Sequence, residues 1–551
     1  MPFAPGPLGI GFPVELSPSP TRDFWEEQIA FLSRVAANAT VAPDSYGAWA
    51  SAGAVNAFPA NYDPTFSFTT KWGSTILLPF GNPGGTVTYA FDAGYGAVAQ
   101  DQARSALALW SAEVNISFTQ AMDPNAADFR FESEPNGTFA LFPKLMRSTI
   151  GSSVVEPPGA EVHVNIDSKA LNPKGDTAPL DGQFDTQGGD AYFALVHELG
   201  HLLNLGHTGP YNASPDHPNE VIAATFQLGV YDTMLWSIMS YVSPEFMGAK
   251  FFNSYPVTGT NWGQVFDPNQ EINFNALATT PMMLDILAAQ RIYGRPTDGP
   301  LVDGNDVFGF NVHLGDDNVA KSIERYFDFT VNKHPVITIW DGGVNNTLDL
   351  SGWSTPSTIN LNPGTFSSAN GQINNIGIAR DTVIETAKGG QGNDIIIGNV
   401  YANFLFGNAG DDTLNGGPGD DTLTGGLGAD HFVLAKISDG VDTFLDFSRM
   451  QHDQIAFDHG GFDLGGTGTL AAVGVSLING ATAETSTPTI LYRAGDVSWD
   501  SDGTGASPPT LLAHVLTAEA PTAVAPGPIM VNPANTAHVF PQLSPDDFVI
   551  V

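Results

Sequence analysis

The segment from His197 to His207 reads HELGHLLNLGH, and it decides how the whole chain is interpreted. His197 and His201 are four residues apart, so both project from one face of a helix and can share a metal ion. Glu198 projects from the neighbouring face, where its carboxylate can reach a water molecule on that metal. The apolar residues 191–196 before it predict the buried helix on which such a site is built.

The third histidine of this segment requires a turn. A helix that continued straight would carry His207 too far from His201 to share an ion, so we predict that the chain turns after Leu203. The turn needs a residue that tolerates positive φ, and Asn204 is the best choice after glycine, with Gly206 adding freedom. Three neutral imidazoles leave one tetrahedral position open for water, which is the arrangement of a catalytic zinc site.

The spacing of this segment resembles the H-E-x-x-H-x-x-G-x-x-H motif of the metzincin metalloproteases, with Asn204 where the family has glycine. Downstream, residues 237–241 read SIMSY and resemble the methionine turn of that family in its serralysin form. The resemblance implies a zinc endopeptidase in which Glu198 is the general base and Met239 packs beneath the metal. The three histidines would be zinc ligands, and Tyr241 would be a further, displaceable zinc ligand that also acts in catalysis.

Residues 61–295 alternate strands and helices in an order that resembles serralysins, which implies an α+β metzincin zinc-protease catalytic domain. The expected elements are strands at 86–91, 114–118 and 162–166 and helices at 97–113 and 281–293. Residues 1–60 form a separate N-terminal segment with one amphipathic helix candidate at 23–37, Asp23 being its N-cap. That helix could belong to a removable pro-segment, as in a zymogen, or pack on the catalytic domain.

A repeat with a period of nine residues follows in the second half of the chain. Residues 389–397 read GGQGNDIII, and four further units begin at 398, 407, 416 and 425. The pattern G-G-x-G-x-D-x-U-x is typical of an all-β parallel β-roll of the RTX type that binds calcium. Each unit makes one turn and one short strand, whose apolar residue enters the core; these predicted core residues are Ile396, Leu405, Leu414, Leu423 and Phe432.

The same repeats predict calcium sites. Glycines let backbone carbonyls face inward, and each aspartate supplies a hard oxygen ligand, so stacked turns can build sites of six or so oxygens. The predicted calcium ligands in the repeats are Gly390, Gly392, Asp394, Gly407, Gly410, Asp412, Gly417, Gly419, Asp421, Gly426, Gly428 and Asp430. Upstream, residues 340–346 resemble an earlier calcium loop of the family, and we expect Asp341, Gly343 and Glu385 to be ligands there.

Composition supports an exported, calcium-binding protein. The chain has 58 acidic and 20 basic residues, a net charge of -38, which argues against nucleic acid and suits divalent cations. It has no cysteine, and we expect neither an N-terminal secretory signal nor a membrane span. Its end, residues 543–551, resembles the uncleaved tail that accompanies type I secretion. We therefore expect an extracellular monomer whose domain at 296–551 folds when external calcium binds.

These observations favour a secreted, zinc-dependent endopeptidase that acts on proteins or peptides, with one catalytic zinc ion and several structural calcium ions. A catalytically silent zinc- and calcium-binding surface or adhesion protein on the same scaffold remains an alternative. A carbohydrate-active enzyme with the same repeats would leave the segment from His197 to His207 unexplained, so it is less favoured.

Overall fold

The computed structural model groups the chain into two compact units. The metal-site unit comprises residues 18–344 and 372–382, and the repeat unit comprises residues 345–371 and 383–551. The domain limits that we predicted from sequence, at 60 and 295, stay predictions. The structure describes residues 24–38, 42, 72, 81–132, 139–140, 145–147, 153–155, 163–165, 190–209, 211, 226–257, 262–267, 272–464, 466–479, 482, 486–505, 507–516 and 543–551.

A mainly parallel sheet organises the metal-site unit. Its strand order is β2-β1-β3-β7-β4, and only β4 runs antiparallel to its neighbour. The core of the sheet is aromatic, because Phe129 and Phe131 are buried and their rings lie 5.3 Å apart. The strands are β1 (Thr86–Phe91), β2 (Ser117–Gln120), β3 (Phe129–Glu132), β4 (Phe139–Ala140) and β7 (His163–Asn165).

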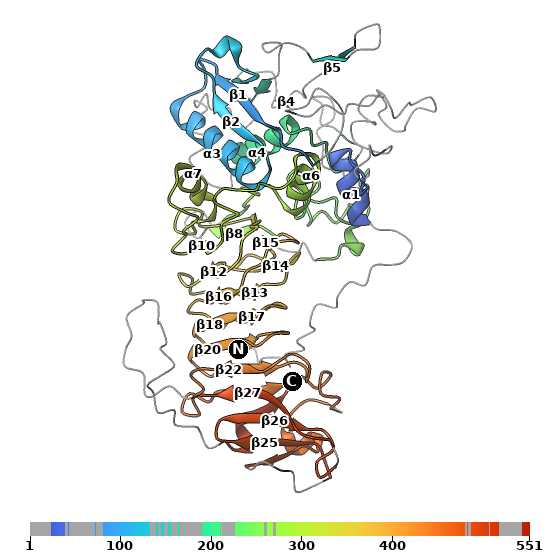
Figure 1. Ribbon diagram of the computed structural model, residues 1–551, viewed down its shortest axis with the longest axis vertical. Coiled ribbons are helices and arrows are strands. Elements are labelled where there is room, and N and C mark those ends of the chain that lie inside the picture. The colour runs from blue at the N-terminus through green and yellow to red at the C-terminus, as the bar shows by residue number, and fades with distance from the viewer. Residues whose placement is uncertain are drawn as a thin grey trace. The chain divides into compact units, whose positions relative to one another are not determined.

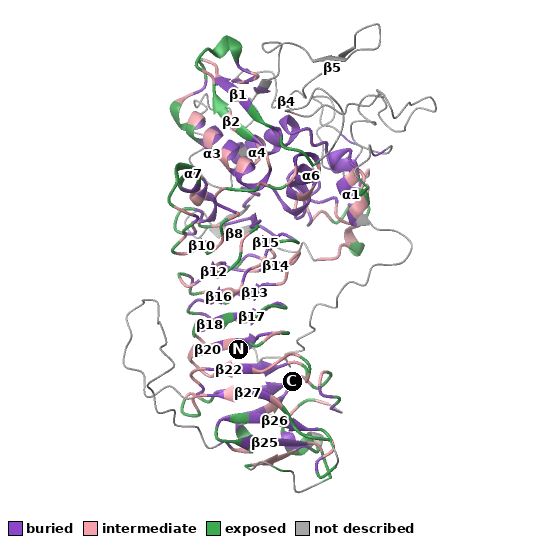
Figure 2. Cartoon of the chain, viewed as in Figure 1, coloured by how far each residue is buried: buried purple, intermediate pink, exposed green. Residues whose placement is uncertain are grey.

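Helices pack around this sheet and around one another. α3 (Ala97–Glu113) contacts α4 (Asp190–Leu202) and α7 (Asn318–Phe327), whereas α1 (Phe24–Ser33) lies against α6 (Met283–Tyr293) (Figure 1). Figure 2 shows that α4 and α6 are almost wholly buried, which follows from their apolar sequences. The smaller elements are β5 (Leu145–Arg147), β6 (Ser153–Val155), β8 (Gln264–Asp267), β9 (Ile272–Asn275), β10 (Val307–Gly309), β11 (Ile337–Ile339) and β15 (Ile376–Ile378).

The repeat unit is a coil of short strands that stack as successive rungs in two parallel sheets (Figure 1). One sheet contains β12 (Thr347–Asp349), β16 (Thr386–Lys388), β18 (Phe404–Ala409), β20 (Thr422–Leu427) and β22 (Asp442–Phe444). The other contains β13 (Thr358–Asn360), β17 (Ile395–Ile397), β19 (Thr413–Asn415), β21 (His431–Leu434), β23 (Gln454–Phe457) and β28 (Phe548–Ile550). The first sheet continues through β27 (Thr510–Val515), β26 (Asp496–Asp500), β25 (Thr489–Arg493) and β24 (Ser476–Ile478).

Two nonapeptides make one turn of this coil. Leu405 of β18 pairs with Leu423 of β20, and Leu414 of β19 pairs with Phe432 of β21, so like residues of one sheet are 18 positions apart. The side chains of the five core residues predicted from the repeat are all 0% exposed, which confirms that prediction. The α+β unit followed by a parallel β-roll is the fold class expected from the sequence.

Three element limits differ from the sequence prediction, each for a local reason. The strand expected at 114–118 begins only at Ser117, because the N–H of Val114 still donates to the carbonyl of Trp110 and closes α3. The helix expected from residue 281 begins at Met283, because the extended backbone of Met282 forms its N-cap. The helix expected at 23–37 ends at Ser33, since Arg34 has a φ of 66°, and residue 23 lies outside the described residues.

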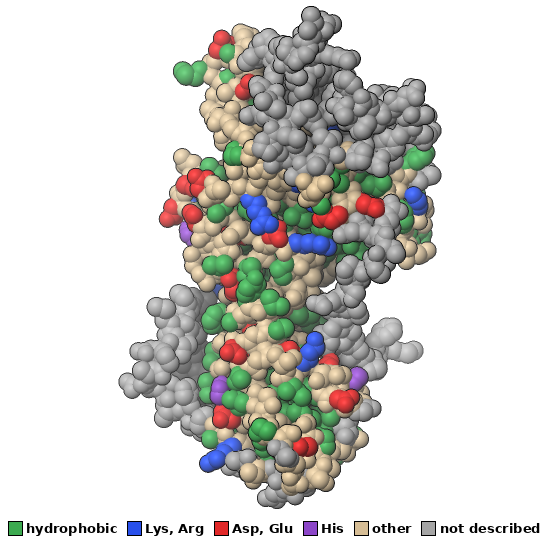
Figure 3. Space-filling model, turned by 45° about the vertical axis from the view of Figure 1, so that its right-hand side comes forward, with side chains coloured by type: hydrophobic (Ala, Val, Ile, Leu, Met, Phe, Trp, Pro, Cys, Tyr) green, Lys and Arg blue, Asp and Glu red, His purple; other side chains and the backbone are tan. Residues whose placement is uncertain are grey.

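Part of the acidic excess of the chain lies on the surface. Figure 3 shows Asp and Glu side chains spread over the drawn face rather than gathered in one patch. The net charge therefore does not mark a single binding surface on that face. Among the described residues, none of the helices combines the length and the apolar character needed to cross a bilayer.

Candidate metal centre

The three histidines of the HELGHLLNLGH segment converge in the metal-site unit. His197 and His201 lie on α4, which ends at Leu202. The chain then turns at Asn204, whose φ is 73°, and the N–H of Leu205 donates to the carbonyl of Gly200. The predicted turn is confirmed, and asparagine adopts the left-handed conformation that the turn requires.

The Nε2 atoms of the three rings face one another. The Nε2 of His207 lies 3.1 Å from that of His201 and 3.3 Å from that of His197. Each Nδ1 instead meets a backbone carbonyl: His197 that of Ile238 at 2.8 Å, His201 that of Leu205 at 2.9 Å, and His207 that of Tyr211 at 3.0 Å. A carbonyl can only accept, so the proton of each neutral ring sits on Nδ1 and a lone pair is left on each Nε2.

Burial keeps these rings neutral. All three are less than 10% exposed. Burial lowers the pKa of His197 to about 4 and that of His201 to about 3, and it lowers the pKa of His207 well below the ordinary range. Three neutral nitrogen donors whose possible ligand atoms lie within 4.8 Å of one another fit a divalent metal such as zinc, because one cation can accept all three converging lone pairs.

The two other predicted site residues are also at this centre. Glu198 is 6% exposed and follows His197 directly on α4. The ring of Tyr241 lies 4.4 Å from that of His207 and 5.7 Å from that of His197, measured between centroids. The phenol therefore stands beside two of the three candidate zinc ligands, while Tyr241 stays partly exposed.

The methionine of the predicted turn packs against α4. Met239 is 0% exposed. Its sulfur lies so close to Gly200 that a side chain at that position would collide with it. Because Gly200 has no side chain, Met239 can approach the helix that carries His197 and His201.

Sequence reasoning missed Asp232, which links the third histidine to the methionine turn. Its Oδ1 accepts hydrogen bonds from the hydroxyls of Thr208 at 2.5 Å, Tyr211 at 2.6 Å and Ser240 at 3.0 Å. Its Oδ2 accepts from the N–H of Leu228 at 3.1 Å. Burial raises the pKa of Asp232, and the hydrogen bonds from the hydroxyls oppose that rise. No spacing in the sequence signals this aspartate, because the three hydroxyls that it binds lie 8 to 24 residues away.

Asp285 of α6 supports the first histidine in a similar way. Its carboxylate accepts from the hydroxyl of Ser237 at 2.5 Å and from the N–H of Ile238 at 2.6 Å. The carbonyl of Ile238 in turn accepts the Nδ1 proton of His197. Burial raises the pKa of Asp285 to about 7, and its hydrogen bonds oppose that rise. The sequence indicated only that Asp285 belongs to the helix that closes the catalytic domain.

The predicted calcium carboxylates form two ladders in the repeat unit. The backbone N–H of Asp394 donates to Oδ1 of Asp412 at 2.7 Å, and that of Asp412 donates to Oδ1 of Asp430 at 2.9 Å. In the second ladder, the backbone N–H of Asn403 donates to Oδ1 of Asp421 at 2.7 Å. The Oδ2 atoms of Asp412, Asp421 and Asp430 are buried and have no hydrogen-bond partner among the residues that the structure describes. Such orphaned anionic oxygens fit hard cations.

Desolvation is costly for these carboxylates. Burial raises the pKa of Asp412 to about 7, that of Asp421 to about 6 and that of Asp430 to about 7, and neighbouring aspartates add to each rise. The first glycine of each unit makes room for the carboxylate, since a side chain at Gly407 would collide with Asp412 and one at Gly425 with Asp430. The glycine pattern of the repeat thus serves carboxylate packing as well as turns.

The predicted upstream calcium residues are divided between the two units. Oδ1 of Asp341 accepts from the N–H of Gly343 at 2.6 Å within the metal-site unit. Oε2 of Glu385 accepts from the N–H of Asn346 at 2.9 Å within the repeat unit. Sequence reasoning missed Asp306, a buried neighbour of Asp341; burial and the second carboxyl group raise its pKa.

Comparisons with known proteins agree with this arrangement. Residues 301–464 match the family described as Peptidase M10 serralysin C terminal. The metalloprotease AprA of Pseudomonas entomophila is 31% identical over 400 residues, which are 67% of this chain and 73% of that protein. The serralysin of Proteus mirabilis is 30% identical over 317 residues, 56% of this chain and 55% of that protein. The solved structure of myroilysin matches at 15% identity with a TM-score of 0.23, covering 41% of this chain and 98% of that one, too little to infer a shared fold.

Proposed function

The chain belongs to the serralysin family of metalloproteases, and we propose that it cleaves internal peptide bonds of protein substrates at the centre formed by His197, His201 and His207. The observation that carries this proposal is the convergence of three buried Nε2 lone pairs, with each Nδ1 proton held by a backbone carbonyl. That arrangement aims three neutral donors at one point before any metal arrives, which is what a catalytic zinc site needs.

Zinc bound by these three rings would supply Lewis-acid chemistry, activating water near neutral pH and polarising the scissile carbonyl. Glu198 would act as the general base, taking a proton from the attacking water and passing it to the leaving amine. Its place next to His197 on α4 and its burial both support that role.

Tyr241 would have two roles. Its ring stands beside His197 and His207, so its hydroxyl could complete the zinc ligand set in the resting enzyme. When substrate displaces it, the same hydroxyl would donate a hydrogen bond to the oxygen on which negative charge develops. Its partial exposure gives it the freedom to move between these positions, unlike the buried histidines.

We also propose that the repeat unit binds several calcium ions through the two aspartate ladders, and that the protein acts outside the cell after type I secretion. The orphaned Oδ2 atoms of Asp412, Asp421 and Asp430 support the calcium sites. Crowded, buried carboxylates would fold poorly where calcium is scarce and well where it is millimolar, which favours folding after export. Deleting residues 543–551 should then abolish export from cells that carry the secretion machinery.

Hydrolysis of casein in the presence of calcium tests the catalytic proposal. The wild type is compared with Glu198→Ala and with Glu27→Ala, a control that removes an exposed glutamate from α1. We expect Glu198→Ala to keep its zinc and to lower kcat by roughly 10²–10⁴-fold, the usual loss on removal of a general base. A zinc chelator should abolish wild-type activity.

Two results of this experiment would contradict the proposal. A folded, zinc-loaded wild type that cleaves no casein would favour the catalytically silent binding protein. Equal activity of Glu198→Ala and Glu27→Ala would remove Glu198 from the mechanism.

A further inference from the structure

The peptide that carries the third histidine is bonded to α1 on both sides of that residue. The N–H of Gly206 donates to the carbonyl of Leu32 at 2.9 Å. The side-chain amide of Gln28 donates to the carbonyl of Thr208. The backbone before and after His207 is thus tied to a helix that lies about 180 residues earlier in the sequence.

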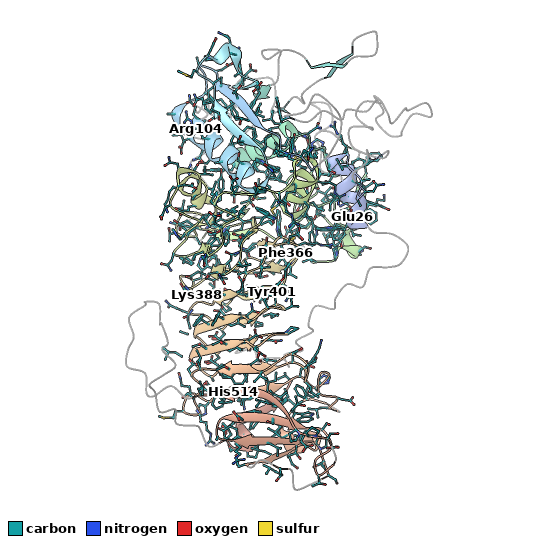
Figure 4. All side chains as sticks on the ribbon, in the orientation of Figure 1. Glu26, Arg104, Phe366, Lys388, Tyr401 and His514 are labelled. Carbon is teal, nitrogen blue, oxygen red and sulfur yellow. The ribbon has the colours of Figure 1, made fainter. Side chains whose placement is uncertain are left out.

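α1 is itself firmly packed in the metal-site unit. Four of its large apolar side chains are buried: Trp25 is 4% exposed, Ile29 2%, Phe31 2% and Leu32 0%. The Trp25 ring meets that of Trp236 edge-on at 5.4 Å, just before the methionine turn. Arg291 of α6 donates to the carboxylate of Glu26 at 2.8 Å and to the carbonyl of Val35 at 3.2 Å; Figure 4 labels Glu26 on α1. The helix is therefore a fixed support for the residues that it touches.

Glutamine is an unusual residue at a fully buried position such as that of Gln28. Its side chain is 0% exposed, and its Oε1 has no hydrogen-bond partner within the described part of the chain. A buried amide costs free energy that a leucine of similar size would not, so packing alone does not account for glutamine here. The bond from Gln28 to Thr208 is the interaction that a leucine could not make.

We propose that Gln28 is a positioning residue for the third metal ligand, and that α1 stays in the mature protein, so that any maturation cleavage lies before Phe24. Loss of the Gln28 bond would leave the Gly206–Thr208 peptide fixed on one side only and would misdirect His207. This inference rests on the proposed zinc site. It narrows the removable part of the predicted N-terminal segment from residues 1–60 to residues 1–23 at most.

Zinc affinity and a metal spectrum test the role of Gln28 without any substrate. Gln28→Leu and Gln28→Met both remove the donor with little change in volume, and Glu27→Gln on the exposed side of α1 is the control. We expect both Gln28 variants to raise the zinc dissociation constant about 10-fold, the low end for residues that orient ligands. The visible spectrum of the cobalt-substituted protein should shift in the same two variants only.

Mass spectrometry of the secreted protein tests whether α1 stays in the mature protein. We expect its N-terminus at or before residue 24, and an active, zinc-loaded form that begins after Phe24 would overturn the proposal that α1 is retained. Wild-type zinc affinity and cobalt spectra in both Gln28 variants would overturn the positioning role. A wild type that binds zinc but cleaves nothing would refute only the proposed protease function, whereas one that binds no zinc would refute both.

Discussion

The metal-site unit and the repeat unit hold their candidate metal ligands in opposite ways. In the metal-site unit the ligands are neutral imidazoles, and contacts from distant segments orient them: Ile238 through Asp285 for His197, and Tyr211 through Asp232 for His207. In the repeat unit the ligands are carboxylates 18 residues apart, and the backbone of the neighbouring turn orients each one. Specific tertiary contacts thus build one site, and a repeated local pattern builds the other.

This difference has an electrostatic consequence. Burial lowers the pKa of the histidines, so they can remain neutral and buried while the metal is absent. Burial raises the pKa of Asp412 and Asp430 to about 7, which means that their charged forms are costly without a cation. We therefore expect the repeat unit to depend on its ion for folding and the metal-site unit to depend on its ion for activity alone.

Removal of calcium should give the largest effect. A calcium-selective chelator should abolish the far-ultraviolet circular dichroism of the repeat unit, and millimolar calcium should restore it. At a calcium concentration 100 times the dissociation constant, each site contributes about 2.7 kcal/mol, so several sites exceed the stability of a small domain. A zinc-selective chelator should leave the spectrum unchanged while activity disappears. A repeat unit that stays folded without calcium would refute this contrast.

Asp232→Ala should break the orientation of His207 and of the methionine turn together. We expect zinc affinity and kcat/KM to fall by roughly 10–100-fold, because three hydroxyls lose their shared acceptor. Zinc competition and peptide hydrolysis measure this effect, with the exposed Asp316→Asn as control. If Asp232→Ala matched that control, orientation by distant contacts would not matter at this site.

Asp412→Asn should weaken one calcium ladder without touching catalysis. The midpoint of calcium-dependent folding should rise by about 2- to 10-fold, because the ladder loses one charged ligand. At saturating calcium, kcat should equal that of the wild type. The adjacent, exposed Asp411→Asn makes the same change in charge, and an equal shift in its midpoint would show that net charge, rather than the buried ladder, sets calcium affinity.

Glu113→Gln should give the smallest effect, a pH-dependent stabilisation of the metal-site unit. Glu113 is 0% exposed, and burial, with a smaller contribution from Asp285, raises its pKa well above 4.5. The folded protein keeps a proton that the unfolded chain loses above pH 4.5, so Glu113 lowers stability increasingly as pH rises toward its folded pKa.

Glutamine has no proton to lose, so the variant should melt a few degrees higher than the wild type at pH 8 and about equally at pH 4.5. Melting curves across this range, with Glu27→Gln as control, measure the effect. A difference in Tm that does not change with pH would show that Glu113 is not the titrating group.

Much of the repeat unit could be predicted from sequence because its contacts are local and periodic. The nine-residue period predicted that Leu405, Leu414 and Leu423 enter one core, and all three are fully buried. The strand expected at 114–118 begins later than the sequence predicted, because a backbone hydrogen bond overrides side-chain preference. Val114 has a strand-forming side chain, but its N–H is used to close α3, and a pattern of side chains carries no information on that bond.

The sequence by itself determined the two metal-binding patterns: the helix that places His197 beside His201, the turn at Asn204, and the spacing of the aspartates. These follow from helix geometry, from the conformations open to asparagine, and from the period of the repeat. Only the tertiary structure decided that Gln28, Asp232 and Asp285 support the histidines. Hydrogen bonds between residues 8 to 180 positions apart depend on how whole elements pack, and no local pattern in the chain encodes them.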